Sequence, residues 1–274
     1  MFTENANGVF SALAIMAVSE YESFADIYDV WTDTAASTRP NLAFYLDACA
    51  RAAGPVVELG VGDGRIAVPA AAAGRNITGV DLSPAMLDRC RARAERAGVL
   101  DRLTLIQADF REFRLPAPAA LITLPYHSIG HLLTLDDKRD ALRHVRSQLR
   151  PGGQFIFDDF LMTPDLVAHM RRVQLRAEYR SASGADTLLW VTSLVEEEAQ
   201  SIRVVTWEDS LNAAGGLIER QYRRLSLSWL TPAQARELLV DAGFVIDAVY
   251  GDFAGTPFSP ESASEQVWVA HRPQ

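Results

Sequence analysis

The chain has few cysteines, no long apolar segment and no excess of basic residues over its 274 positions. Its only two cysteines, Cys49 and Cys90, are too few for a disulfide framework and lack the spacing of metal ligands, so we expect no bound metal. No apolar run reaches the roughly 18–20 residues that a membrane-spanning helix needs. The apolar segment 9–18 lacks the basic flank and cleavage site of a signal peptide. We therefore expect a cytoplasmic protein that does not bind a membrane.

The charge balance is acidic, with 26 Lys and Arg against 35 Asp and Glu and a net charge of −9. Proteins that bind nucleic acid gain much of their affinity from Lys and Arg side chains that neutralise phosphates. The arginines of segment 89–96 alternate with alanines and a glutamate, which is typical of a solvated helix face. The composition therefore disfavours DNA or RNA as a partner.

Three alternating glycines follow a short apolar segment in residues 56–65, which read VVELGVGDGR. Glycine is needed where a loop takes positive φ or where a ligand approaches the backbone closely. The small apolar residues that follow can form a helix whose free N–H groups face the loop. A second apolar segment, 77–80, ends in Asp81, whose carboxylate could bind the hydroxyls of a ribose. This pattern predicts a nucleoside-binding βαβ unit.

The glycine spacing separates this loop from two other nucleotide-binding loops. A dinucleotide fingerprint reads G-x-G-x-x-G/A, but Arg65 stands where its third small residue belongs. No Gly-Lys-Ser/Thr follows, which argues against a P-loop. A nicotinamide-dependent oxidoreductase is therefore an alternative that the loop itself disfavours.

The segments ELGVGDGR (58–65), GVDLSPAML (79–87) and QADF (107–110) follow one another in an order that resembles the class I S-adenosylmethionine-dependent methyltransferases. The resemblance implies S-adenosyl-L-methionine as cofactor and an α/β fold, with a Rossmann-like seven-stranded, mostly parallel sheet and helices on both faces. It also implies the cofactor-binding residues: Gly60, Gly62 and Gly64 along the methionyl part, Glu58 near its ammonium group, Asp81 at the ribose, Leu82 and Met86 around the adenine, Asp109 and the Phe110 N–H on its polar edge, with Tyr28 and Leu124 completing the site.

A second informative segment, His127-Ser128-Ile129-Gly130-His131, follows the fourth predicted strand. It resembles the Ser-Ser-Ile-Gly-His segment of bacterial sugar-amine N-methyltransferases, and Tyr28-Asp29 resembles a Tyr-Asp near their N-termini. This resemblance implies a small-molecule acceptor, methylated on nitrogen, in bacterial secondary metabolism such as antibiotic biosynthesis. His131, His127 and Asp158 are the candidate catalytic residues, because a histidine can act as a general base and an aspartate at a strand end can orient it or bind an ammonium group. Each of the three could also be structural.

Other acceptors stay open. Adenine and cytosine amino-methyltransferases carry Asp, Asn or Ser where this chain has Leu124, whose side chain accepts no hydrogen bond, so a base-flipping enzyme is disfavoured. A hydroxyl acceptor needs a general base more than a neutral amine does. An O- or C-methyltransferase and a non-catalytic S-adenosylmethionine-binding partner protein therefore remain alternatives.

The order of elements completes the predicted architecture. Strands and helices that alternate from residue 56 to 158 predict a parallel sheet covered on both faces. Alternating apolar and polar residues predict antiparallel strands at 188–195, 201–207 and 217–229. The expected domains are two N-terminal helices or a lid (1–55, interrupted at Arg39-Pro40), a methyltransferase core (56–172 and 230–274) and an antiparallel insert (173–229) that either caps the substrate or forms the surface of a homodimer.

Overall fold

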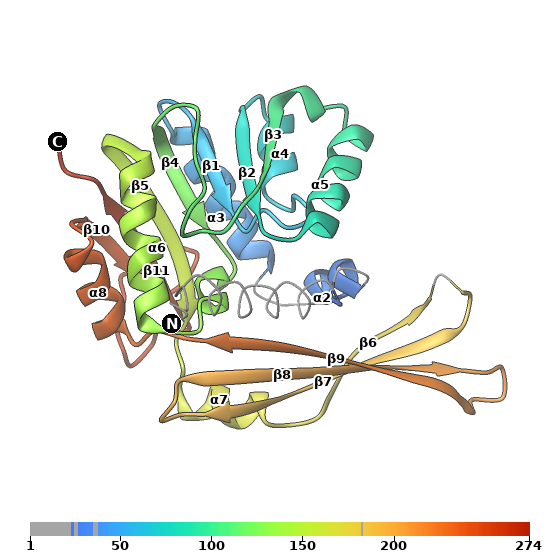
Figure 1. Cartoon of the computed structure of the whole chain (residues 1–274). Helices are drawn as coiled ribbons and strands as arrows, with labels where there is room; N and C mark the ends of the chain where they lie inside the picture. Colours follow the sequence, from blue (N-terminus) through green and yellow to red (C-terminus); the bar gives the residue numbers. More distant parts are fainter. Residues whose placement is uncertain (1–22, 25–26, 35–37, 182) are drawn as a thin grey trace, which may run out of the picture. The chain divides into compact units, whose positions relative to one another are not determined.

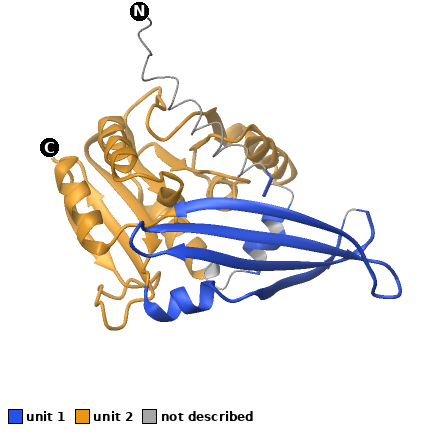
Figure 2. Ribbon diagram, turned by 60° about the horizontal axis from the view of Figure 1, so that its bottom comes forward, with its two compact units in different colours: residues 1–35, 163–227 blue, residues 36–162, 228–274 orange. Residues whose placement is uncertain are grey.

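The computed structural model describes the chain except residues 1–22, 25–26, 35–37 and 182. The apolar segment 9–18 and the first residues of the predicted N-terminal helix, which include Tyr21, lie outside the described residues. The chain divides into two compact units, a smaller one of residues 1–35 and 163–227 and a larger one of residues 36–162 and 228–274 (Figure 2). None of the described helices is long and apolar enough to cross a membrane.

The larger unit holds a seven-stranded sheet in the order β10-β11-β5-β4-β1-β2-β3 (Figure 1). Strands β1 to β5 pair in parallel, whereas β11 runs antiparallel to both β5 and β10. This arrangement confirms the predicted fold class, including the antiparallel last strand. The strands are β1 Val56–Leu59, β2 Ile77–Asp81, β3 Leu103–Gln107, β4 Ala119–Leu124, β5 Leu149–Phe160, β10 Val245–Tyr250 and β11 Glu265–His271.

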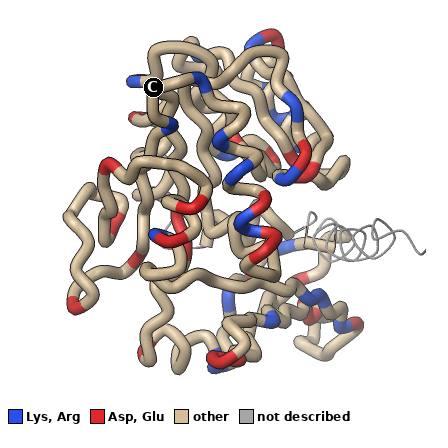
Figure 3. Tube along the Cα trace, turned by 60° about the vertical axis from the view of Figure 1, so that its left-hand side comes forward, with Lys and Arg blue, Asp and Glu red and all other residues tan. Residues whose placement is uncertain are grey.

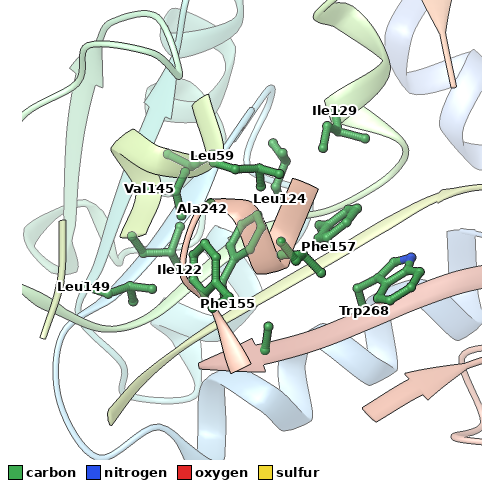
Figure 4. Packing of buried hydrophobic residues seen from close by; sticks show 14 of the residues in the cluster. Leu59, Ile122, Leu124, Ile129, Val145, Leu149, Phe155, Phe157, Ala242 and Trp268 are labelled. Atoms are coloured by element: carbon green, nitrogen blue, oxygen red, sulfur yellow. The ribbon is translucent and has the colours of Figure 1, made fainter. Parts of the chain in front are cut away.

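Helices cover both faces of this sheet: α3 Thr38–Arg51, α4 Ala67–Ala72 and α5 Pro84–Arg96 cover one face, and α6 Leu135–Gln148 and α8 Pro232–Asp241 cover the other. Successive side chains of a strand point to opposite faces, so each strand contributes residues to the hydrophobic core on either side of the sheet. Phe155 and Phe157 pack in the core under α6 and α8 (Figure 4), whereas Ile156 packs in the core under α3, α4 and α5. The same alternation places Asp158 and Asp159, at the carboxyl end of β5, on opposite faces.

Helix starts follow local capping chemistry. The Ser83 hydroxyl accepts the N–H of Met86 at 3.2 Å and so caps the start of α5. Thr231 and Gln234 form a capping box at the start of α8. The prediction that Arg39-Pro40 separates the two N-terminal helices was wrong, because α3 begins at Thr38 and includes both residues. Proline is tolerated there because N–H groups in the first turn have no helical partner.

The smaller unit contains α2 Tyr28–Asp33, α7 Pro164–Met170 and a four-stranded antiparallel sheet in the order β6-β7-β8-β9. Its strands are β6 Gln174–Arg180, β7 Asp186–Glu196, β8 Ser201–Leu211 and β9 Leu217–Ser228. The three predicted antiparallel strands are confirmed as β7 to β9. Strand β6 was not predicted; three of its seven residues are charged, and the register shifts between Leu175 and Ala177. The roles of the insert as a cap or a dimer surface stay predictions.

Candidate functional site

The glycine loop after β1 adopts a conformation that only glycine takes easily. Gly60, Gly62 and Gly64 have φ angles of +64°, +55° and +82°. A Cβ atom on Gly60 would lie 3.1 Å from the Ser128 hydroxyl, and one on Gly64 would lie 2.7 Å from Cys90 Sγ. The loop therefore contacts the segment after β4 on one side and packs closely against α5 on the other.

Asp81 connects this loop to the end of β2. Its carboxylate accepts the N–H of Gly62 at 2.8 Å and the N–H of Ser83 at 2.9 Å. Burial raises the pKa of Asp81, and the hydrogen bonds from Ser83 and Gly62 oppose that shift. The main chain of Leu82 also contributes a hydrogen bond, and because a carboxylate has about four acceptor sites, Asp81 still has room to accept a ligand's hydroxyl group.

We expect Asp81→Ala to weaken the binding of S-adenosylhomocysteine by about ten- to a hundredfold, because it removes charge-assisted hydrogen bonds to the ribose and releases Gly62 from β2. Titration calorimetry on the wild type and the variant measures this effect. Asp88→Ala on α5, the helix that follows β2, is the control. The Asp88 side chain is 74% exposed and pairs only with Arg91 among the contacts described. Equal affinity in wild type and Asp81→Ala would remove Asp81 from the site.

Glu58, at the end of β1, has a buried carboxylate oxygen, Oε2, with no hydrogen-bond partner in the described structure. Burial raises its pKa to about 8, although the charge of Arg65 works against this shift. Buried polar atoms are nearly always paired, so an orphaned carboxylate oxygen is the expected partner of a ligand's cation. The ammonium group of S-adenosylmethionine fits this oxygen, and its ribose fits Asp81.

The raised pKa of Glu58 predicts that cofactor binding releases a proton near neutral pH. Below pH 8 the carboxyl is mostly protonated, and an ammonium ligand favours its ionised form. Calorimetry of S-adenosylhomocysteine binding at pH 7 in two buffers of different ionisation enthalpy should show close to one proton released. Glu58→Gln should bind more weakly and release none. The same heat in both buffers with the wild type would contradict this prediction.

At the predicted adenine end, the Asp109 carboxylate already binds Arg111. It accepts the Arg111 N–H at 2.8 Å and both Nε and Nη2 of the guanidinium, which also pairs with Asp137 of α6. Phe110 is half-buried, and its ring lies 3.4 Å from the Cβ position of Gly60. Met86 is buried and Leu82 half-buried. Adenine recognition by these residues stays a prediction.

The segment after β4 is strained at two residues that are not glycine. Tyr126 and His127 have φ angles of +61° and +56°, which side chains with a Cβ rarely adopt. Asp158 holds both, because its carboxylate accepts the N–H of Tyr126 at 2.9 Å and the N–H of His127 at 3.0 Å. It also accepts the Tyr45 hydroxyl at 2.6 Å and the Asn41 amide at 3.3 Å. Such strain persists only where the surroundings fix it, and it concentrates at functional sites.

Arg65 connects the glycine loop to this strained segment. Its guanidinium donates to the Asn41 side chain at 2.6 Å and lies 5.2 Å from the centre of the Tyr126 ring. Asn41 in turn donates to Asp158. The sequence indicated only that Arg65 replaces a glycine; the partners Asn41 and Tyr45 were missed, because their buried positions depend on how α3 is rotated against the sheet.

His127 lies between two carboxyl groups. Its ring stacks on Phe160 with 3.8 Å between the centroids, Nδ1 lies 3.5 Å from Asp158, and Nε2 lies 3.8 Å from Glu265. Burial lowers the pKa of His127, which Asp158 partly opposes. Burial raises the pKa of Glu265 to about 9, and Asp158 and Asp159 add to this effect. At neutral pH the imidazole is therefore neutral and Glu265 carries a proton.

His131 ends the short 3₁₀-helix η3 Ser128–His131. Burial and the charge of Lys138 lower the pKa of His131 to about 4, so its imidazole is neutral near pH 7 and able to accept a proton. The structure thus places all three candidate catalytic residues at the carboxyl edge of the sheet, His127 and His131 after β4 and Asp158 within β5. Their catalytic roles stay predictions.

Leu124 and Tyr28 are the two remaining predicted cofactor contacts. The Leu124 side chain is buried in the core under α6 and α8 (Figure 4), which leaves only its main chain for a ligand. Tyr28 begins α2 in the smaller unit, and its carbonyl accepts a hydrogen bond from the Thr32 hydroxyl. Its part in cofactor binding stays a prediction.

Comparison with known proteins matches residues 56–153 to a methyltransferase domain family. The chain is 28% identical over 160 residues to the 27-O-demethylrifamycin SV methyltransferase of Amycolatopsis mediterranei and spans 58% of that relative and 53% of itself. It is 24% identical over 208 residues to the cypemycin N-terminal methyltransferase of a Streptomyces species, over 76% of this chain and 79% of the relative.

Solved structures show the same fold. The CcbJ methyltransferase of Streptomyces caelestis aligns over 92% of this chain and 96% of its own, with a TM-score of 0.75 and 24% identity. CalS10, an amino pentose methyltransferase of Micromonospora echinaspora involved in calicheamicin biosynthesis, aligns over 92% and 96% with a TM-score of 0.65 and 21% identity. At these identities the likeness establishes the fold.

Proposed function

The methyltransferase domain makes this chain a member of the class I S-adenosylmethionine-dependent methyltransferases, and from that premise we propose that it transfers the methyl group of S-adenosyl-L-methionine to the amine nitrogen of a small molecule. A role in bacterial secondary metabolism, such as antibiotic biosynthesis, is part of the proposal. The relatives named for rifamycin and cypemycin and the structure titled for calicheamicin biosynthesis support that setting.

One observation carries the choice of an amine: buried carboxyl groups gather where the acceptor would stand. Asp158 and Glu265 flank His127, and Ser128, the next residue, lies against Gly60 of the glycine loop. Burial keeps Glu265 protonated at neutral pH, and a cationic acceptor beside it would favour its ionised form, so these carboxyl groups support an ammonium group as the acceptor. In this proposal the methyl donor and the acidic groups would meet at the carboxyl edge of the sheet.

The described residues would act mainly by placing the two substrates. Glu58, Asp81 and the glycine loop would bind the cofactor, whose sulfonium supplies an activated methyl group. The acceptor would attack as the free amine, and a neutral imidazole, His131 or His127, would orient it through a hydrogen bond. Asp158 would keep the Tyr126–His127 turn in its strained form, so that these groups stand ready before the acceptor binds.

A nucleic-acid acceptor fits the described surface poorly. Acidic and basic residues are interspersed along the trace in Figure 3, and that view shows no continuous basic stripe. An oxygen acceptor is the second candidate function, because the relative from Amycolatopsis mediterranei is named as a 27-O-demethylrifamycin SV methyltransferase and a neutral imidazole suits the deprotonation of a hydroxyl.

The test is methyl transfer from labelled S-adenosylmethionine to panels of amino sugars, amino acids, cyclic amines and phenols, with the methylated atom located by NMR. We expect turnover with amines and none with tRNA or DNA oligonucleotides at physiological salt. Transfer to a phenol or alcohol alone would replace the proposal by the oxygen-acceptor alternative. Transfer to nucleic acid, or cofactor binding with no turnover on any acceptor, would overturn it.

A further inference from the structure

Lys138 is the only lysine among the 274 residues, and it is buried. Its side chain is 1% exposed, on the face of α6 that also buries Ala141, Leu142 and Val145. Lysine is almost never fully buried without partners, because an ammonium group loses its hydration. A single lysine in such a position therefore needs a structural or functional reason.

The ammonium group has an acceptor for each of its three N–H bonds. It donates to the carbonyl of Ile129 at 2.7 Å, to the carbonyl of Leu132 and to the Ser228 hydroxyl at 2.9 Å. The Ser228 hydroxyl donates to the Leu132 carbonyl at 2.9 Å. The two carbonyls stand on either side of His131 in the sequence, so the ammonium group grips the turn that carries this histidine.

A buried carboxylate balances the charge. Asp159 lies on the same face of the sheet and accepts the N–H groups of Leu230 and Phe160 at 2.8 Å each. Burial lowers the pKa of Lys138, whereas Asp159 and Asp137 oppose this shift. Ser228 is the last residue of β9, Leu230 follows it, and both belong to the larger unit. Lys138 thus fixes the turn and Ser228, and Asp159 fixes the main chain at Leu230.

We propose that Lys138 is a positioning residue for methyl transfer: its ammonium group fixes the Ser128–His131 turn against α6, and His131 with it. This inference rests on the proposed function, because it takes His131 as part of the acceptor site. The charge of Lys138 also reaches the imidazole, since it is the second cause, after burial, that lowers the pKa of His131.

The geometry requires lysine rather than arginine. Three acceptors converge on one nitrogen atom, which suits a compact ammonium group, whereas a guanidinium group spreads its donors over a planar fork. Lys138→Arg keeps the charge and loses this convergence, and Lys138→Met loses both. The two variants therefore separate the geometric effect from the electrostatic one.

The first measurement needs no acceptor: NMR titration of the five histidines, with the His131 signal assigned by its loss in His131→Asn. In Lys138→Met we expect the pKa of His131 to rise by about one unit, because a nearby positive charge is gone. Arg143→Met, an exposed position on the same helix, is the matched control and should leave that signal in place. An unmoved His131 signal in Lys138→Met would refute the electrostatic part.

The second measurement compares kcat, KM and S-adenosylhomocysteine affinity in Lys138→Arg and Ser228→Ala. We expect kcat to fall at least tenfold in Lys138→Arg and less in Ser228→Ala, with cofactor affinity within about threefold of wild type. Ser228→Ala keeps the lysine and so retains a test if either Lys138 variant fails to fold. Wild-type kcat in folded Lys138→Arg and Ser228→Ala would overturn the proposal. A wild-type protein without methyltransferase activity would instead refute the proposed function. The histidine titration would then still test whether Lys138 acts on His131.

Discussion

Replacing His131 by Asn is expected to lower kcat, by about 10²–10⁴-fold if its imidazole acts as a general base and by less if it only orients the amine, with the affinity for S-adenosylhomocysteine within about threefold of wild type. The burial that lowers the pKa of His131 to about 4 keeps its imidazole unprotonated across the neutral range. A base of this kind is lost only when the pH falls through its pKa. Any acid limb of the kcat/KM profile that belongs to His131 should therefore lie near pH 4, well below the limb set by protonation of an amine acceptor.

The size of the effect separates two roles for His131. A general base removed from the reaction lowers kcat, whereas a group that only orients a neutral amine affects KM as well and costs less. His127→Asn tests the second imidazole, and His169→Asn, an exposed position of the smaller unit, is the control. Full activity in both His131→Asn and His127→Asn would show that these histidines are structural. We expect the larger loss at His131, because it matches the histidine of the Ser-Ser-Ile-Gly-His segment of the sugar-amine enzymes, whereas His127 stands where that segment has a serine.

Local signals were sufficient to predict the cofactor half of the fold. The glycine loop, Asp81 and the Ser83 cap each depend on residues within a few positions of one another or at the ends of adjacent strands. The apolar periodicity of β1 to β4 and the helices between them follows from the same short-range chemistry. Strand β6 escaped prediction because charged residues dominate its composition.

Long-range partners could not be read from the sequence. Asp158 and Asp159 are adjacent in the sequence, at the end of β5. That their side chains lie on opposite faces, in two different environments, follows only from where the strand lies in the sheet. Asp158 meets Tyr45 and Asn41, which precede it by 113 and 117 residues on α3. Lys138 looks like one of the solvated charges of its helix until the helix is packed against the turn at His131.

Removal of the Asp158 carboxylate should produce the largest loss of stability among these predictions. The side chain is fully buried and accepts hydrogen bonds from the main chain of Tyr126 and His127 and from the Tyr45 hydroxyl. Asp158→Ala leaves these three donors without their acceptor, at about 1–3 kcal/mol each, and frees a turn whose left-handed residues are unfavourable without support. A total of about 3–9 kcal/mol corresponds to a fall in Tm on the order of 10 °C or more.

Thermal unfolding of Asp158→Ala, Tyr45→Phe and Asp136→Ala tests this account of the turn. Tyr45→Phe removes one donor together with its bond and should cost only about 1 kcal/mol, because the carboxylate and the other donors remain paired. Asp136→Ala removes a carboxylate that is 89% exposed and should change the free energy of unfolding by less than about 1 kcal/mol. If Asp158→Ala had the same Tm as Asp136→Ala, contacts other than those of Asp158 would hold the turn. If it melted far below Tyr45→Phe, the main-chain bonds to Tyr126 and His127 would account for most of the anchor, and methyl transfer should fall with them.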